Sequence, residues 1–538
     1  MAIYYFRSAN GNWNSAASWS ISDNGPANGA IPTSADDAYF TSNSGNCTVN
    51  TAGMVCKTLI FNGVGAGNYA STFSLTNTLT VSGSITLSST MTFAGTSTIT
   101  INAASTITTN TKVFTCNFTI NAVSAIIITL GDDVYISGSI TFASTAVTVT
   151  GNTLYIAGSF TMNAGTASII NSNLVFNGTG SITAASSGAN IGGSGNITFN
   201  TTGTISFNTT WFNTTSGASR SISYVAGRVI VPVGSTLTIA ATAGTVSLDL
   251  SGVIINGGLF LGCGNFPSGG IISLISDLNV EGIFQFGSTS VSGAQNLIIN
   301  TAGGTLRLGK NRMCTSIIGT VANATQVTGT CPIVIGGSGF CTWSCSGILI
   351  ALSITFNFLG KLNSFDSSGG VAGMRLATGT FTYLSGSFSS YNFANSIGKG
   401  TLAMFSCTLI GFNRVSGFGN ISIVSASTIT MDKFFCGSPQ CVTSVACATS
   451  TGSYTIVFQD TFEKLANFIK LANCTVTQRG QLLVLNNKAN GGRNIGVRYI
   501  NTLPNGVAKH QQNQPAHFAG EPMTFGASGL VSDPAITL

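Results

Sequence analysis

Acidic side chains are the first groups in this sequence that could do chemistry, and they are few. Asp and Glu together number 14 in 538 residues. A glycosidase needs two carboxyl groups about 5–9.5 Å apart. The adjacent acids Asp132-Asp133 would face opposite sides of a strand, and the order Gly131-Asp132-Asp133 favours a turn. Asp36-Asp37 lie in the predicted N-terminal cap.

A second acidic pair, Asp277 and Glu281, is predicted to lie on one face of a strand. Four residues of strand separate such carboxyl groups by about 13 Å, which is too far for shared catalysis. Stacked strands can still bring distant acids together, and the candidates for such a groove are Asp249, Asp277, Glu281 and Asp366. Because acids are so scarce, we predict no catalytic residues.

Histidine and cysteine patterns predict neither a catalytic triad nor a metal centre. A Ser-His-Asp site needs a positioned histidine, and both histidines, His510 and His517, lie in a proline-rich C-terminal segment. The 13 cysteines include no Cys-x-x-Cys pair of the kind that structural zinc sites use. We interpret them as small buried apolar residues of a chain made in a reducing compartment, with Cys116 inside a strand. No metal and no cofactor are predicted.

Charge is scarce throughout the chain. Charged residues make up 6% of it, against about 25% in an ordinary globular domain. The missing charge is replaced by Ser, Thr, Asn and 66 glycines. Helical bundles carry charged outer faces and disordered chains carry high net charge, so both are excluded. The composition predicts an all-β protein with a neutral, hydroxyl-rich surface.

Short alternating runs recur about every 20 residues in the N-terminal half. Ile136, Ile156 and Phe176 are 20 residues apart, and each stands two residues before a glycine. A period of this length without a helical pattern predicts a right-handed parallel β-helix, or solenoid, with about 20 residues per coil. The glycine fits a corner where a Cβ would crowd the next coil, and stacked hydroxyls and amides can bond along the ladder. A string of β-sandwich modules is the alternative.

Changes in composition and in the repeat pattern divide the chain into four segments. We predict an N-terminal cap module at 1–70, a regular β-solenoid at 71–305, an irregular β region at 306–485 and an extended docking arm at 486–538. The cap would cover the open edge of the first coil. The irregular region is either continued solenoid or a second β domain.

Basic residues gather near the C-terminus, where Lys464 to Lys509 includes seven basic residues and no acidic one. Their wide spacing, without interleaved aromatics, argues against nucleic acid and favours a protein partner. The residues predicted to dock on that partner are Arg493, Arg498, Lys509, His510 and His517. Trp211 and Trp343 are candidate platforms for glycans, although packing in the core is the commoner role of tryptophan.

Aromatic, proline and acidic residues near the N-terminus follow a distinctive order. The order is Asn12-Trp13, Trp19-Ser20, Pro32, Asp36-Asp37, Phe40, Cys47-Thr48-Val49-Asn50 and Cys56-Lys57-Thr58-Leu59. It resembles the N-terminus of predicted β-helical virion proteins of tailed bacteriophages, especially aquatic ones. A looser version of the order is similar to the start of some autotransporter-type passengers.

The resemblance implies a fibre, spike or decoration subunit on a phage virion that binds other virion structural proteins. By analogy with β-helical fibres a homotrimer is expected, and the neutral polar face suits host surface glycans. The N-terminus lacks a signal-peptide pattern and the longest apolar run is strand-sized, so we expect synthesis in the host cytoplasm and no membrane insertion. Two alternatives remain open: a tailspike-like polysaccharide depolymerase, and a secreted bacterial β-helical adhesin.

Overall fold

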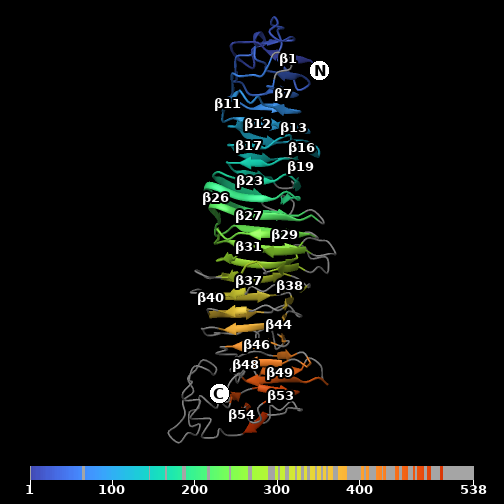
Figure 1. Cartoon of the computed structure of the whole chain (residues 1–538), viewed down its shortest axis with the longest axis vertical. Coiled ribbons are helices and arrows are strands. Elements are labelled where there is room, and N and C mark those ends of the chain that lie inside the picture. Colours follow the sequence, from blue (N-terminus) through green and yellow to red (C-terminus); the bar gives the residue numbers. More distant parts are fainter. Residues whose placement is uncertain are drawn as a thin grey trace. The chain divides into compact units, whose positions relative to one another are not determined.

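The computed structural model is an all-β fold in which strands pair in parallel with strands one coil later (Figure 1). It describes residues 2–306, except for 63–66, 144–145, 164–166, 185–189, 215–217, 242–243, 264–269, 289–296 and 301–302. Beyond 306 it describes the strands given below by their backbone, and side chains only within 423–428, 445–447, 451–458 and 471–477. The chain divides into two compact units, Met1–Ile254 and Ile255–Leu538.

The first unit consists of coils of three short strands that form three stacked columns, here called faces A, B and C. Face A contains β1 (Ile3–Phe6), β4 (Asp37–Tyr39), β7 (Thr58–Ile60), β10 (Ile85–Thr86), β13 (Ser105–Thr108), β16 (Ile126–Leu130), β19 (Ala146–Gly151), β22 (Ala167–Ile170), β25 (Asn190–Gly192) and β28 (Thr236–Ala241). Face B contains β2 (Asn10–Asn12), β5 (Asn46–Val49), β8 (Thr72–Leu75), β11 (Thr92–Gly95), β14 (Val113–Phe114), β17 (Val134–Ile136), β20 (Leu154–Ile156), β23 (Leu174–Phe176) and β29 (Thr245–Asp249). Face C contains β6 (Met54–Cys56), β9 (Leu79–Val81), β12 (Thr98–Ile101), β15 (Asn117–Ile120), β18 (Ile140–Phe142), β21 (Phe160–Met162) and β24 (Gly180–Ala184).

Two longer strands, β26 (Ile197–Asn213) and β27 (Arg220–Val231), each run across more than one face. The short β3 (Trp19–Ser20) pairs antiparallel with β1, after a 3-10 turn at Ala16–Ser18. Among the residues described, no helix is long and apolar enough to cross a membrane.

The second unit repeats the same parallel pairing. One column contains β31 (Gly258–Cys263), β34 (Ile283–Ser288), β37 (Cys314–Thr320), β40 (Phe340–Cys345) and β43 (Lys361–Asp366). Another contains β32 (Gly270–Leu274), β35 (Leu297–Asn300), β38 (Ala324–Thr328), β41 (Ile348–Leu352), β44 (Gly373–Tyr383), β45 (Thr401–Met404), β47 (Asn420–Ile423), β49 (Thr443–Cys447) and β52 (Ile469–Ala472). The third contains β33 (Leu278–Val280), β36 (Leu306–Leu308), β39 (Ile333–Ile335), β42 (Phe356–Phe358), β46 (Cys407–Ile410), β48 (Thr428–Met431), β50 (Tyr454–Phe458) and β53 (Cys474–Val476). β30 (Val253–Ile255) spans the boundary between the units, and β51 (Lys464–Ala466), β54 (Leu482–Leu485) and β55 (Val497–Ile500) form a separate sheet.

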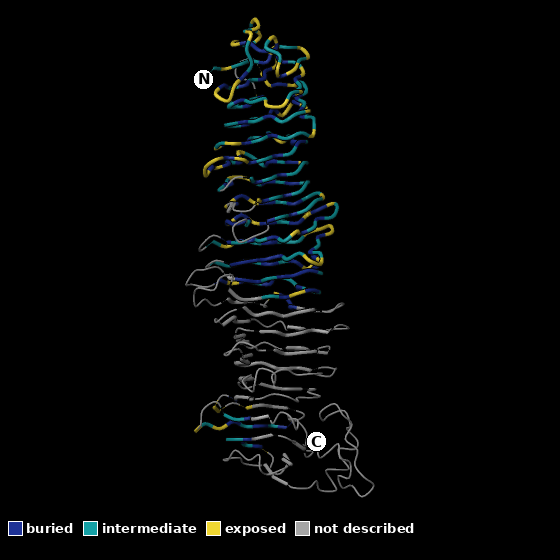
Figure 2. The backbone as a smooth tube through the Cα atoms, turned by 180° about the vertical axis from the view of Figure 1, so that it is seen from behind, coloured by how far each residue is buried: buried dark blue, intermediate teal, exposed yellow. Residues whose placement is uncertain are grey.

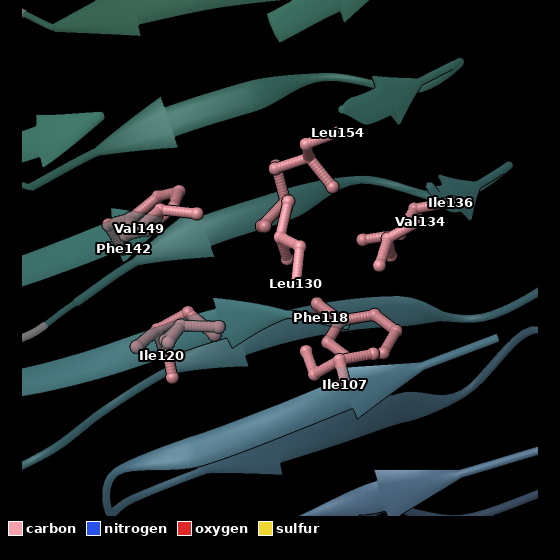
Figure 3. Close-up of a pocket in the computed structure, with 11 residues that line it drawn as sticks. Ile107, Phe118, Ile120, Leu130, Val134, Ile136, Phe142, Val149 and Leu154 are labelled. Atoms are coloured by element: carbon pink, nitrogen blue, oxygen red, sulfur yellow. The ribbon is translucent and has the colours of Figure 1, made fainter. Parts of the chain in front are cut away.

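Alternation along each strand separates the core from the surface. In β17, β20 and β23 the first and third residues are buried and the middle residue is half-buried. Figure 2 shows buried and intermediate segments alternating along the coils of the first unit. Apolar side chains of successive coils fill the interior (Figure 3), and the void that eleven of them line measures only about 10 Å³. A space this small and apolar is a packed core and cannot hold a ligand.

The predicted 20-residue repeat is confirmed where it was seen. Ile136 pairs with Ile156, and Ile156 pairs with Phe176, so the sequence period is the pairing register. The period then lengthens, because Phe176 pairs with Phe199, 23 residues later, and Ile197 pairs with Ile222, 25 residues later. Irregularities in β26 accompany the lengthening, since its register shifts near Asn200.

Hydroxyl and amide side chains at the corners bond from coil to coil, as predicted. The amide N–H of Ser139 donates to Asn117 Oδ1 (2.8 Å), that of Ser159 to Ser139 Oγ (3.1 Å) and that of Ser181 to Ser159 Oγ (3.0 Å). Each corner residue thus satisfies a backbone donor that the strand pairing leaves free. This ladder explains why Ser and Asn replace charged residues at this edge.

The glycines of the repeat stand at crowded corners, which confirms their predicted role. A Cβ on Gly138 would meet the carbonyl of Cys116, and a Cβ on Gly158 would meet the carbonyl of Gly138, both within 3.0 Å. In the second unit a Cβ on Gly282 would meet the carbonyl of Gly257 in the same way. Because the obstacle is backbone, a neighbouring side chain cannot give way to relieve it.

Residues of the predicted cap form strands that continue the three faces. Their interior is an aromatic cluster in which Trp13 and Trp19 lie edge to face at 4.9 Å and Trp19 meets Phe40 at 5.7 Å. The indole N–H of Trp19 donates to the carbonyl of Trp13 at 2.8 Å. The residues that carry the N-terminal resemblance therefore hold the first coils together, and a capping role stays a prediction.

Arg220 is a buried cation that joins several coils. Its guanidinium donates to the carbonyls of Gly195 (2.7 and 2.9 Å), Ile191 (2.8 Å), Asn213 (2.9 Å) and Ile170 (3.5 Å). Burial lowers the pKa of Arg220 to about 10, so the side chain remains charged at neutral pH. The guanidinium supplies five donors in one plane, enough for these carbonyls at the place where the coil lengthens.

The crowding at the glycine corners predicts that one added methyl group lowers the stability of the surrounding coils. Gly158→Ala should destabilise the coils around β20 by about 1–3 kcal/mol, because the Cβ collides with backbone. Hydrogen exchange of 134–184 measures this as faster local opening. Gly234→Ala is the control: it has a positive φ of 88° but open space, so it should cost about 1 kcal/mol. Equal effects of the two substitutions would contradict the corner argument.

The arginine predicts a larger effect confined to its own coils. Arg220→Met removes the guanidinium from four carbonyls, at about 1–3 kcal/mol for each one that is left unsatisfied. The carbonyl of Ile170 still accepts the N–H of Gly195. We expect strong loss of exchange protection in β25, β26 and β27, with β14 to β18 unchanged. Arg220→Lys should restore only part of the protection, because one ammonium cannot reach all four carbonyls. Full protection in the methionine variant would show that the guanidinium does not hold these coils.

Candidate functional site

A surface pocket on face B brings together an aromatic ring and two acids. Thr111, Val113, Asp132, Asp133 and Tyr135 line it, and its volume is about 260 Å³. Asp132 and Asp133 form the turn between β16 and β17, as predicted, while Thr111 and Val113 belong to the coil before. This is the one place in 58–219 where acidic side chains occur at all.

Asp132 positions the turn of the neighbouring coil. Its carboxylate accepts the backbone N–H groups of Thr109 (2.7 Å) and Asn110 (2.6 Å), and the hydroxyl of Thr109 (3.2 Å). Asn110 and Thr111 both have positive φ, 49° and 68°, a conformation that a β-branched residue such as threonine rarely adopts. The bonds to Asp132 hold this strained turn, which places Thr111 at the pocket.

Asp133 has a different role from its neighbour. One carboxylate oxygen, Oδ1, accepts the backbone N–H of Thr153 in the next coil at 3.0 Å. Within the part of the chain that the structure describes, Oδ2 accepts no hydrogen bond, and the half-buried side chain lines the pocket. Asp133 therefore keeps acceptor capacity for a donor that enters from solvent.

Tyr135 and Tyr155 stack on the outer side of face B. They are register partners on β17 and β20, with ring centroids 4.4 Å apart and planes 9° apart. Partial burial, then the neighbouring Tyr155 and Asp133, raise the pKa of Tyr135 above its ordinary value. Tyr135 is therefore a neutral phenol at physiological pH, with one ring face held against Tyr155.

The same Asp-Asp-x-Tyr order occurs at Asp36-Asp37-Ala38-Tyr39. There too the first acid is structural: Asp36 accepts the N–H of Ala2 (2.8 Å) and the hydroxyl of Thr33 (2.5 Å), and the latter bond in particular lowers its pKa. Tyr39 pairs with Tyr5, but these rings lie 5.5 Å apart and are tilted by 42°. The Asp-Asp-x-Tyr order thus occurs twice at the start of a strand. Only the second occurrence, at Asp132 to Tyr135, has a flat tyrosine stack beside a pocket.

The sequence did not reveal Tyr135 and Tyr155 as site residues, although a signal was present. Both are the middle residue of the 20-residue repeat, so each faces outward while its neighbours face the core. Identical outward aromatics at equal positions of consecutive coils predict a stack on the surface.

Three of the four acids that the sequence suggested for a groove, Asp249, Asp277 and Glu281, have described side chains. Asp277 and Glu281 flank β33, which contains only Leu278–Val280, so their predicted place within one strand is wrong. Asp277 accepts the N–H of Thr305 at 2.9 Å, and Asp249 accepts the N–H (3.2 Å) and hydroxyl (2.9 Å) of Ser251. Asp366 ends β43, and its side chain lies outside the described residues.

The predicted glycan platforms and docking residues are placed only in part. Trp211 lies on β26, half-buried, with Thr238 as its register partner. Trp343 and Arg498 lie on β40 and β55, with only their backbone described. Arg493, Lys509, His510 and His517 lie outside the described residues. Glycan contact and docking by these residues stay predictions.

Comparison of the chain with protein families, curated proteins and solved structures finds no match. Among the residues described, no group of three or more His, Cys, Asp or Glu is placed to hold a metal ion. What the face B pocket offers is an aromatic surface, one open carboxylate oxygen and a hydroxyl side chain.

Cysteines in the described part of the chain are free thiols and mostly buried. Cys47, Cys56, Cys116 and Cys474 are buried, and Cys447 is half-buried. Cys116 lies at the corner between β14 and β15, so its predicted place inside a strand is wrong. Burial raises the pKa of its thiol to about 12, and this thiol is therefore not a nucleophile at neutral pH.

The thiol environment predicts pH-dependent protection. At pH 8, iodoacetamide should leave Cys116 of the folded protein unlabelled and label it fully after unfolding, as peptide mass spectrometry can show. Val123→Cys, at a fully exposed position, should label at once in the folded protein.

Because the pKa of Cys116 is raised in the folded protein, the contribution of the Cys116 thiol to stability is present below about pH 8.5 and is lost as the pH rises toward 12. Rapid labelling of native Cys116 would refute its burial.

Proposed function

We propose that this chain is a non-enzymatic structural and binding subunit of a phage virion. It is a β-helical fibre, spike or decoration protein on the particle surface, and it contacts host surface glycans. The observation that carries the proposal is the coil-to-coil ladder of uncharged side chains at the corners of the solenoid. The N-terminal resemblance supports the same proposal.

The ladder suits a fibre because it adds side-chain bonds to the backbone pairing between coils. A stack held together at both its strands and its corners resists bending and local opening. Few charges face solvent between 58 and 219, where Lys112, Asp132 and Asp133 are the only charged residues. Such a surface can bond to neutral sugar hydroxyls without competing ions.

Assembly on the particle is assigned to the C-terminal segment. The basic residues Arg493, Arg498 and Lys509 would meet an acidic surface of another virion protein, and the free end of the solenoid would meet the host. A homotrimer is the expected assembly by analogy with β-helical fibres.

Electron microscopy of the source particles, labelled with an antibody against this chain, tests the proposal. We expect label on the particle surface and density for a parallel solenoid that contacts another virion protein. A glycan array probed with the full chain at 50 mM and 500 mM salt should give binding that changes little, because neutral ligands are not screened. Absence of the chain from the particles would refute the virion role, and release of reducing ends from a bound glycan would replace the binding role with a depolymerase.

A further inference from the structure

We propose that the face B pocket of Thr111, Val113, Asp133 and Tyr135 is a subsite for one neutral sugar ring. The inference rests on the proposed glycan-binding function and names the place and chemistry of binding. The site differs from the tryptophans that the sequence suggested. Its volume of about 260 Å³ lies just below that of pockets for drug-sized ligands, which suits a single ring rather than a long oligosaccharide.

One face of the Tyr135 ring is available to a ligand. Tyr155 covers the other face, with the ring centroids 4.4 Å apart and the planes 9° apart. On the available side the register partner is Val113, a side chain that ends well short of a tyrosine ring. Val113 is 45% exposed, so the outer part of the ring overhangs open space and not another side chain. The C–H groups of a sugar ring pack on an aromatic face of this kind.

Polar groups stand beside this ring face. Asp133 lines the pocket, and its Oδ1 accepts the N–H of Thr153, which fixes the carboxylate and leaves Oδ2 as the oxygen that can take a further donor. A sugar hydroxyl can donate to Oδ2, and such a bond to an ionised acceptor is stronger than a neutral one. The exposed Thr111 hydroxyl offers a second, neutral contact.

The charge around the pocket favours hydroxyl donors over a cation. Asp132 also lines the pocket, but it already accepts two backbone N–H groups and a hydroxyl. Lys112 belongs to the same turn as Thr109 and Thr111, so the three charged residues of this part of the chain sum to a net charge of −1. One open carboxylate oxygen beside an aromatic face provides too few ligands for a divalent ion.

The site is also organised before a ligand arrives. The stack on Tyr155 fixes the Tyr135 ring, the Thr153 bond fixes Asp133, and the bonds to Asp132 fix the turn that carries Thr111. A ligand therefore orders few side chains when it binds, which favours measurable affinity from a small contact.

Hydrogen exchange of the full chain with the methyl glycosides of glucose, galactose, mannose and N-acetylglucosamine tests the inference. At millimolar concentration at least one glycoside should protect 109–113 and 131–135. Tyr135→Leu should weaken this binding about tenfold, since it removes the ring face but keeps an apolar strand residue. Asp133→Asn should weaken it several-fold, because its amide oxygen still accepts from Thr153 but its charge is lost. Tyr135→Phe should bind nearly as wild type.

Tyr39→Leu is the matched control, because it breaks the other tyrosine pair of the unit, which does not line the pocket. It should leave sugar binding unchanged. Unaltered affinity in folded Tyr135→Leu would overturn the site, and so would protection by calcium or choline instead of sugars. If the array shows glycan binding and the pocket variants keep it, this inference fails alone. If neither the array nor any glycoside shows binding, the glycan part of the proposed function fails with it.

Discussion

Parallel backbone pairing between successive coils is the constraint on which the rest of this structure depends. Because strands pair in register, the side chain at each position stacks on its equivalent about 4.8 Å away. Like charges at that spacing repel and a corner Cβ meets the backbone of the next coil, whereas a hydroxyl or amide finds a partner. The charged fraction of 6%, the glycine content and the Ser, Thr and Asn surface all follow from this one requirement.

Two charged residues of the first unit, Asp132 and Arg220, show how a charge is accommodated between stacked coils. Asp132 is balanced by backbone N–H groups of the neighbouring coil, and Arg220 by backbone carbonyls of several coils. Asp132 binds N–H groups of an irregular turn, whereas Arg220 binds carbonyls of three strands and of Gly195, which lies between strands. A charged side chain is stable there because peptide dipoles surround it, and it needs no ion of opposite charge.

The sequence predicted the features that repetition makes visible. Ile136, Ile156 and Phe176 stack as expected, and Gly138 and Gly158 stand at crowded corners, because these coils have equal lengths. The lengthening after Phe176 was not predictable, since corners accept extra residues without a pattern. The burial of Arg220 was also missed, because its partners are backbone groups that no residue type reveals.

The candidate site could not be predicted from residue types. It depends on two coils that place tyrosines in register, and on the preceding coil, which has a valine at the same position. Tyr135 and Tyr155 lie flat against each other since their coils are equally long and equally flanked, whereas Tyr5 and Tyr39 are 34 residues apart and tilted.

On the other side of Tyr135 the pattern breaks, and Val113 stands where a third tyrosine would have continued the stack. A third ring would have covered the open face, and a fully irregular coil would have left the first ring unsupported. Tyr155 also has a valine, Val175, as its register partner on the far side, but only Tyr135 lines the pocket beside Asp133. The site therefore needs both the end of the tyrosine stack and the acidic turn that precedes β17.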